Sequence, residues 1–330
     1  MSRISYAGKV LRALILAIAV SPLAAAGAEW KPQANVEIVV PSGPGSGLDT
    51  TGRTLQKVIQ ENKLLAVPSI VMNKPGAGGS IAYMYLNQHP GNPHYISITS
   101  PGVVTNKIIG MSTIDYGDLT PLAHLFDENI AFMVLPDSKI RDVKTLVAML
   151  KKDPGAVTFG IATALGGANH IATASALKTA GVDIKNSRNI VYKSGGEVTI
   201  ALLGGHVDVV PISAPIAAPH LQSGKVRVIA VSSPTRMGGV FANVPTWREQ
   251  GIDSTYSTWR GVVGPKGMTK EQISYWDAFF AKVTALDTWK KLLEANGWVS
   301  NPLNSEQSRA FLERERQLHQ AILGELGMAK

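Results

Sequence analysis

The amino-acid sequence predicts an α/β fold in which two lobes are joined by two crossing strands. Short apolar runs rich in Val and Ile alternate with segments of helical spacing, which is typical of a mainly parallel sheet flanked by helices. The 330 residues are enough for two domains with a sizeable core. Apolar runs at 131–135 and 226–231 bracket the middle of the chain, so we expect it to leave the first lobe at one run and return at the other. Two lobes joined in this way can rotate about the crossing strands.

These two runs set the predicted lobe boundaries. Lobe 1 comprises residues 29–131 and 232–330, and lobe 2 comprises residues 132–231. In lobe 1 three strands each lead through a turn into a helix, at 36–40 and 48–60, 69–72 and 80–88, and 95–99 and 103–109. In lobe 2 we expect strands at 157–161 and 189–192 and helices at 143–151, 170–180 and 197–203. Three further helices, at 270–283, 287–296 and 305–326, complete lobe 1.

Glycine-rich turns stand between several of these strands and helices. The turn within 38–51 places free backbone N–H groups and the positive end of a helix dipole at one point, which suits it to hold an anion without a cationic side chain. The segment 73–80 repeats this arrangement in lobe 1, and 162–169 and 193–196 repeat it in lobe 2. Because the carboxyl ends of parallel strands meet at one edge of a sheet, we expect these turns to converge on a ligand.

The glycine spacing fits neither a nucleotide-binding loop nor a catalytic turn. Gly47 is followed by Leu48 and Asp49, whereas a P-loop needs Lys and then Ser or Thr. A dinucleotide loop needs Gly-x-Gly-x-x-Gly, but Leu48 and Ile81 occupy its last position. The serine in 43–47 is out of register for a nucleophile elbow. We therefore expect a binding protein that is not an enzyme and has no cofactor.

Histidine, cysteine and charge narrow the class of ligand. The chain has 7 histidines and 0 cysteines, and no two histidines have the i, i+4 spacing of a helical metal site, so we expect neither a metal nor a disulfide. The formal net charge is +8, with lysine and arginine scattered along the chain, so nucleic acid is not an expected partner. A mildly positive surface helps to attract an anionic solute.

Residues 1–28 have the pattern of a secretory signal peptide. Three basic residues precede an apolar core at 13–20, which is too short to span a bilayer, and small residues follow. We expect cleavage after Ala28, with cleavage after Ala26 and an uncleaved anchor as the alternatives. Because no cysteine is present to carry a lipid, the mature chain is expected to be free in the periplasm.

Seven short segments carry a family pattern, at 41–49, 73–79, 118–121, 202–208, 230–233, 244–246 and 259–261. In this order they resemble the extracytoplasmic solute-binding receptors of tripartite tricarboxylate transporters, also known as Bug receptors. The details at 195–197 and 259–260 are similar to the branch that includes the citrate-type receptors. The resemblance covers essentially the whole mature chain and implies the type II-like, two-lobed fold of periplasmic binding proteins.

The resemblance also implies a function. Such a receptor closes like a flytrap on a small organic di- or tricarboxylate and delivers it to a two-component membrane permease; we expect it to be a monomer. The alternative is a receptor of the same fold that presents the carboxylate to a membrane sensor kinase. Carried over by position, the ligand contacts are Ser42, Gly43, Ser46, Gly47, Asp49, Gly78, Gly79, Ser80 and Ser100 in lobe 1, and Thr163, Asn169, Ser194, Gly195, Glu197 and Ser213 in lobe 2.

Some charged residues near these turns have a second interpretation. Asp49 and Glu197 lie early in their predicted helices, where a carboxylate complements the dipole or caps backbone amides. Arg260 suits either a bidentate pair with a ligand carboxylate or an internal salt bridge at the lobe junction. Ser46 and Leu48 depart from the first loop of the family, which leaves the size of the pocket and the identity of the acid open.

Overall fold

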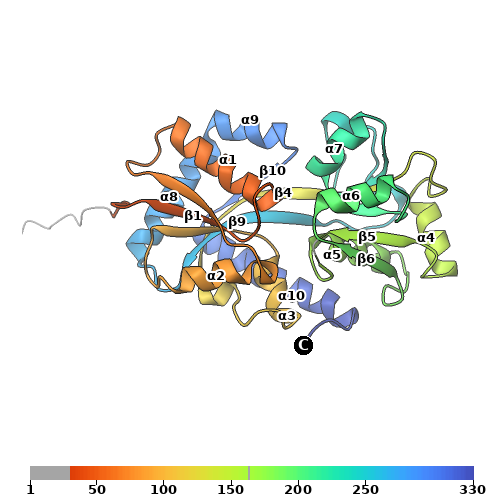
Figure 1. Cartoon of the computed structure of the whole chain (residues 1–330), viewed down its shortest axis with the longest axis horizontal. Helices are drawn as coiled ribbons and strands as arrows, with labels where there is room; N and C mark the ends of the chain where they lie inside the picture. Colours follow the sequence, from red (N-terminus) through yellow and green to blue (C-terminus); the bar gives the residue numbers. More distant parts are fainter. Residues whose placement is uncertain (1–29, 163) are drawn as a thin grey trace, which may run out of the picture.

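The computed structural model describes residues 30–162 and 164–330, so the expected signal peptide and Thr163 lie outside the described residues. Figure 1 shows two lobes side by side along the long axis, with the strands β4 (Leu119–Val134) and β9 (Ser257–Pro265) running through the middle. Helices pack around the strands of each lobe. The predicted two-lobed α/β fold is therefore confirmed.

The first lobe is built on three parallel strands. β1 (Val36–Val40) lies between β2 (Ser69–Asn73) and β3 (Tyr95–Thr99). All of its residues except Glu37 are apolar because both faces are covered: Val36, Ile38 and Val40 pack in one core cluster, and Val39 packs in another. The three strands lead into α1 (Gly47–Glu61), α2 (Ser80–Asn87) and α3 (Gly102–Ile108), close to the predicted bounds.

The sheet of the first lobe is mixed, which differs from the mainly parallel sheet that the sequence predicted. Its strand order is β10-β4-β9-β3-β1-β2, with β10 at Val299–Leu303. The pairs β3–β9, β9–β4 and β4–β10 are antiparallel. This orientation arises because β9 enters the lobe from the lobe junction and runs opposite to both β3 and β4.

The long strand β4 belongs to both lobes. Its residues 119–129 pair with β9 and β10, and residues 130–134 pair with β7 (Val210–Ser213) and β8 (Arg227–Val231). The outgoing crossing is therefore a single continuous strand. β8 pairs only with the second part of β4, so the chain returns through residues 232–256, which lead into β9.

The second lobe repeats the strand-to-helix pattern. β5 (Thr158–Ala162) pairs in parallel with β6 (Arg188–Tyr192), and a bridge between Phe159 and Val209 connects β5 to the start of β7. Four helices surround these strands: α4 (Val143–Lys152), α5 (Ala168–Thr179), α6 (Gly195–Leu203) and α7 (Ala214–Gln222). α7 has no counterpart among the predicted helices, because its two prolines obscure the helical pattern.

The C-terminal helices complete the first lobe and reach the second. α8 (Lys270–Ala285) and α9 (Asp287–Ala295) bury Trp276 and Trp289 completely. α10 (Ser305–Glu325) packs against β4 and α3 of the first lobe and against α5 of the second. Within the described ranges, no helix combines the length and the apolar character needed to cross a bilayer.

Candidate ligand-binding site

The turns that follow β1, β2 and β3 touch one another. A Cβ placed on Gly79, whose φ is +99°, would lie 2.9 Å from the Pro41 side chain, and one placed on Gly102 would lie 3.2 Å from the Gly78 carbonyl oxygen. Asn106 of α3 donates a hydrogen bond of 2.8 Å to that same carbonyl. The glycines thus allow three backbone segments to meet, as the predicted convergence at the sheet edge requires.

Asp49 holds the first turn together. Its carboxylate accepts hydrogen bonds from the Gly45 backbone N–H (2.8 Å), from Arg53 Nε (2.9 Å) and from Asn73 Nδ2 (2.9 Å). Burial alone would raise the pKa of Asp49, but these hydrogen bonds outweigh burial and hold that pKa below its usual range. Of the two interpretations of Asp49, these contacts therefore agree with the structural one, in which the carboxylate orders the turn and does not bind the ligand.

Serine residues shape the beginning of α1. Ser46 is the N-cap, and its hydroxyl accepts a hydrogen bond of 3.2 Å from the Asp49 backbone N–H. The same hydroxyl contacts the Ser42 hydroxyl. Gly43 and Gly47 stand on either side of the turn tip, and a Cβ placed on Gly43 would meet nothing within 4 Å. The turn therefore has open space at Gly43 and an exposed backbone at Gly47.

In the second lobe, an equivalent turn precedes α6. Ser194 is the N-cap and accepts a hydrogen bond of 3.2 Å from the Glu197 backbone N–H, while the Glu197 carboxylate accepts one of 3.0 Å from the Lys193 backbone N–H. Glu197 therefore also makes the structural contact expected of a capping residue. A Cβ on Gly195 would lie 3.0 Å from the Ile216 side chain, so this turn packs closely against α7.

A buried ion pair at the lobe junction connects the first turn of lobe 1 to the end of β7 in lobe 2. Glu128 of β4 accepts a hydrogen bond of 2.8 Å from Arg260 Nη2 and one of 2.9 Å from the Ser213 hydroxyl at the end of β7. Arg260 Nη2 also lies 3.4 Å from the position of a Cβ on Gly47. Contacts thus run from the first turn through Arg260 and Glu128 to Ser213. The internal salt bridge proposed for Arg260 is present, and Glu128 is a residue that the sequence pattern did not single out.

Two polar groups of this region lack partners. Arg260 is 8% exposed, and its Nε has no hydrogen-bond partner among the described residues. Nε and Nη2 lie on the same edge of a guanidinium, so Glu128 occupies only one of two parallel donors. Ser80 Oγ, at the beginning of α2, is also buried without a partner. Both groups can donate a hydrogen bond to a carboxylate oxygen.

A neutral hydroxyl pair lies next to Ser100. Tyr83 Oη and Thr99 Oγ1 are 2.9 Å apart, and burial raises the pKa of Tyr83 to about 12. The Tyr83 hydroxyl therefore stays protonated and neutral at physiological pH. It adds a fixed dipole beside the floor of the site and no charge.

The structure places the predicted site residues in two groups. Contacts connect the three turns of the first lobe to one another and, through Arg260 and Glu128, to Ser213. Among the described residues, no hydrogen bond or ion pair joins Asn169, Ser194, Gly195 or Glu197 to the first lobe, and Thr163 lies outside the described residues. Asn169 is partly exposed in the first turn of α5, where its carbonyl accepts a hydrogen bond from Thr173. In residues 30–162 and 164–330, no three His, Asp or Glu side chains are grouped to hold a metal ion.

Comparisons with known proteins match almost the whole chain. BugT of Bordetella pertussis is 27% identical over 97% of this chain and 98% of its own length. A TctC solute-binding protein from Polaromonas, determined without ligand, is 26% identical with a TM-score of 0.72, covering 89% of this chain and 99% of that one.

Two structures from Rhodopseudomonas palustris share the fold. One, determined with adipate, is 22% identical with a TM-score of 0.79, covering 90% of this chain and 99% of that one. The other, MatC with bound malate, is 20% identical with a TM-score of 0.74, covering 88% of this chain and 99% of that one.

The family comparison identifies the chain directly. The family described as tripartite tricarboxylate transporter family receptor matches residues 53–328, which is most of the sequence. The family-level resemblance predicted from the seven sequence segments is therefore confirmed. The chain belongs to the tripartite tricarboxylate transporter receptor family, whose members are periplasmic solute-binding proteins.

Proposed function

We propose that this protein captures a small organic di- or tricarboxylate between its two lobes and delivers it to the membrane permease of a tripartite transporter. The observation that carries the proposal is the junction of glycine turns with Arg260. There, backbone amides, serine hydroxyls and a buried guanidinium with one free donor lie together. These are the groups that bind carboxylates in proteins.

The turns have separate roles in this proposal. In the first lobe, Ser42, Gly43, Ser46 and Gly47 bind one carboxylate, and Gly78, Gly79, Ser80 and Ser100 line the floor. In the second lobe, Thr163, Asn169, Ser194, Gly195 and Ser213 approach the ligand when the lobes close. Asp49 and Glu197 support ligand binding without contacting the ligand. Their carboxylates accept backbone hydrogen bonds that hold the two turns in shape.

Relatives of the same fold support a carboxylate as the ligand. Adipate and malate, which the two Rhodopseudomonas palustris structures contain, are both small dicarboxylates. The formal net charge is +8 for the whole chain and +5 without the signal peptide, and this positive charge favours the approach of such an anion. We therefore place the substrate class at aliphatic acids with two or three carboxylates.

The proposal includes export and lobe boundaries. Residues 1–28 act as a signal peptide, and the mature chain works in the periplasm as a monomer. Lobe 1 comprises residues 29–131 and 232–330, and lobe 2 comprises residues 132–231. The change of β4 partners between Asn129 and Ile130 supports this division.

Calorimetric titration tests the ligand class. The purified protein is titrated with malate, adipate and citrate, and the dimethyl ester of adipate serves as a neutral control. We expect saturable binding of at least one acid and none of the ester, because each carboxylate contributes charge-assisted hydrogen bonds. Absence of binding by every acid, or equal binding of adipate and its ester, would contradict the proposal.

Delivery to a permease needs its own test. The liganded protein is cross-linked to membranes of the host, and the products are identified by mass spectrometry. Cross-links to permease subunits are expected. Cross-links to a sensor kinase alone would instead favour a receptor that senses the carboxylate.

A further inference from the structure

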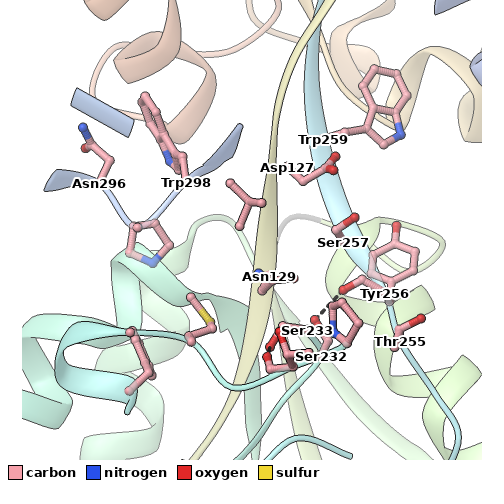
Figure 2. Close-up of a pocket in the computed structure, with 18 of the residues that line it drawn as sticks. Asp127, Asn129, Ser232, Ser233, Thr255, Tyr256, Ser257, Trp259, Asn296 and Trp298 are labelled. Carbon is pink, nitrogen blue, oxygen red and sulfur yellow. Dashed lines mark hydrogen bonds between the residues drawn. The ribbon is translucent and has the colours of Figure 1, made fainter. Parts of the chain in front are cut away.

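A second cavity lies away from the proposed carboxylate site, along the same hinge strands. Its volume is about 1010 Å³, and none of the described residues proposed to bind the carboxylate lines it. Because side chains alternate along a strand, Glu128 and Arg260 point to one face of β4 and β9, and Asp127, Asn129 and Trp259 point to the other. Figure 2 shows these last three residues, with the β4 ribbon running through the middle of the view.

The walls come from both lobes. The first lobe contributes Trp298 at the beginning of β10 and the α10 residues Phe311, Glu315 and Leu318. The second lobe contributes Pro215 and Ala218 of α7, and residues 232–241 close the cavity on the side of the returning chain. Along one edge of β4, the pairing with β10 ends at Asp127 and the pairing with β7 begins at Ile130. Neither strand pairs with Glu128 or Asn129, which leaves room for a ligand beside the hinge.

Two carboxylates in this cavity have no lysine or arginine as an ion-pair partner among the described residues. Asp127 accepts a hydrogen bond of 2.8 Å from Asn301 Nδ2 and lies 3.0 Å from His124 Nε2, and Glu315 accepts one of 2.8 Å from Trp259 Nε1. Burial raises the pKa of Glu315 to about 7, and the nearby charge of Asp127 raises it further.

The neighbouring basic groups compensate these carboxylates only in part. His124 lies against Asp127, and the exposed Arg314 lowers the pKa of Glu315 by less than burial raises it. His319 Nδ1 lies 3.8 Å from the Glu315 carboxylate, but burial lowers the pKa of His319 to about 4, so the ring is neutral at physiological pH. Arg236, which also lines the cavity, is half exposed and is paired with Glu249 at 2.8 Å. Glu294 adds a third carboxylate to the lining. The cavity is thus acidic in a chain whose net charge is +8.

Asn129 gives an independent indication of a ligand. It is only 4% exposed, it lines the cavity, and its side chain has no hydrogen bond to any described residue. Its amide is not sealed from solvent, so it faces the cavity and is available to bond to a ligand there. Ser257, directly opposite in the β4–β9 register, also lines the cavity without a side-chain hydrogen bond among the described residues. A ligand with hydrogen-bonding groups would satisfy both side chains.

We propose that this cavity binds a small organic cation, a protonated amine with an apolar body. The ammonium would lie between Asp127 and Glu315 and reach the Asn129 carbonyl, and the apolar body would pack on Trp259, Phe311 and Trp298. Aromatic faces beside carboxylates are a favourable setting for an ammonium group. The volume matches the upper range of small-molecule sites. This site is separate from the proposed carboxylate site and does not depend on it.

A matched pair of probes tests the proposal. The purified protein is titrated with benzylamine and with benzyl alcohol, which has nearly the same shape and no charge. Binding is followed by calorimetry and by tryptophan fluorescence, since Trp259 and Trp298 line the cavity. We expect saturable benzylamine binding that is at least about tenfold tighter than benzyl alcohol binding. No saturable benzylamine binding, or equal binding of the two probes, would overturn the proposal.

Variants locate the binding. Glu315→Gln and Asp127→Asn keep the shape and an acceptor oxygen at each position, and each should weaken benzylamine binding about tenfold. Asp287→Asn, at an 88% exposed side chain outside the cavity, is the matched control and should change nothing. Thermal melts verify that each variant is folded. Unchanged benzylamine affinity in both cavity variants would contradict the assignment of this cavity as the amine site. If a variant does not fold, the comparison of benzylamine with benzyl alcohol on the unmodified protein still tests the proposal.

Discussion

Glu128→Gln tests the ion pair at the lobe junction most sharply. Glu128 is 3% exposed, and its Oε2 accepts hydrogen bonds from both Arg260 and Ser213. Glutamine keeps the shape and one acceptor oxygen but removes the negative charge. The substitution therefore leaves the Arg260 guanidinium buried without a counter-charge.

The expected loss of stability is large. Removing one partner of a buried ion pair typically costs about 3 to 5 kcal/mol, and the retained acceptor oxygen places this variant near the lower end. A domain has about 5 to 15 kcal/mol of unfolding free energy in total, so the change is easily measured by urea denaturation. Asp287→Asn is the control and should lose almost nothing, because Asp287 is exposed.

Ligand binding should change in the opposite direction. With residue 128 neutral, the repulsion between the ligand and Glu128 disappears. The amide oxygen of glutamine is a weaker acceptor than a carboxylate, so a ligand carboxylate can displace it from Nη2 and bind Nε and Nη2 of Arg260 bidentately. We expect about tenfold tighter binding of the acid found by calorimetry, and a larger ligand-induced gain in stability than in the unmodified protein. A stability loss below about 1 kcal/mol together with unchanged affinity would refute this account of Arg260.

Three further predictions concern single positions. Gly43→Val should abolish carboxylate binding without loss of stability, because the space beside Gly43 is open. Gly238→Val, at an equally open position, is the control and should bind the carboxylate normally. Equal affinities of the two variants by calorimetry would exclude the first turn from the site. Ser46→Ala removes an N-cap, so it should lower the free energy of unfolding in urea by about 1 kcal/mol and also weaken carboxylate binding. Thr269→Ala removes the N-cap of α8 and should lower the stability by the same amount with full carboxylate affinity. If both variants lost affinity equally, the effect of Ser46 on binding would have a general structural cause. Burial raises the pKa of Glu315 to about 7 from a usual value of 4.5, so the folded state keeps a proton that the unfolded state loses over this range. The unfolding free energy of the unmodified protein, measured relative to that of Glu315→Gln, should therefore fall by up to about 3 kcal/mol between pH 4.5 and pH 8. If the stabilities of the two proteins changed with pH in the same way, Glu315 would not have the raised pKa of a buried carboxylate.

Local sequence patterns predicted most of the fold. Each of the strands β1, β2 and β3 ends at a glycine- or serine-rich turn, and these turns marked the beginnings of α1, α2 and α3 within one residue. β4 was underestimated, because His124, Asp127 and Glu128 interrupt the apolar pattern of its first part although most of this part is buried. β10 was not predicted, since its sequence contains Asn301 and Pro302.

The candidate site was only partly predictable. The turns carry a local signal, so residues such as Ser42 and Gly79 could be proposed from spacing and family resemblance. Glu128 carries no such signal, because its role depends on contacts with Arg260 and Ser213, which lie 132 and 85 positions further along the chain. The second cavity combines six separate segments of the chain, and its acidic character appears only when Asp127 and Glu315 come together.

The central claim is that one carboxylate ligand contacts both lobes and draws them together. Small-angle X-ray scattering of the protein with and without a saturating concentration of the acid identified by calorimetry tests it directly. A ligand that binds the closed form more tightly shifts the population toward that form, so the account predicts a smaller radius of gyration with the acid present. An unchanged radius of gyration at a concentration that saturates the calorimetric signal would contradict it.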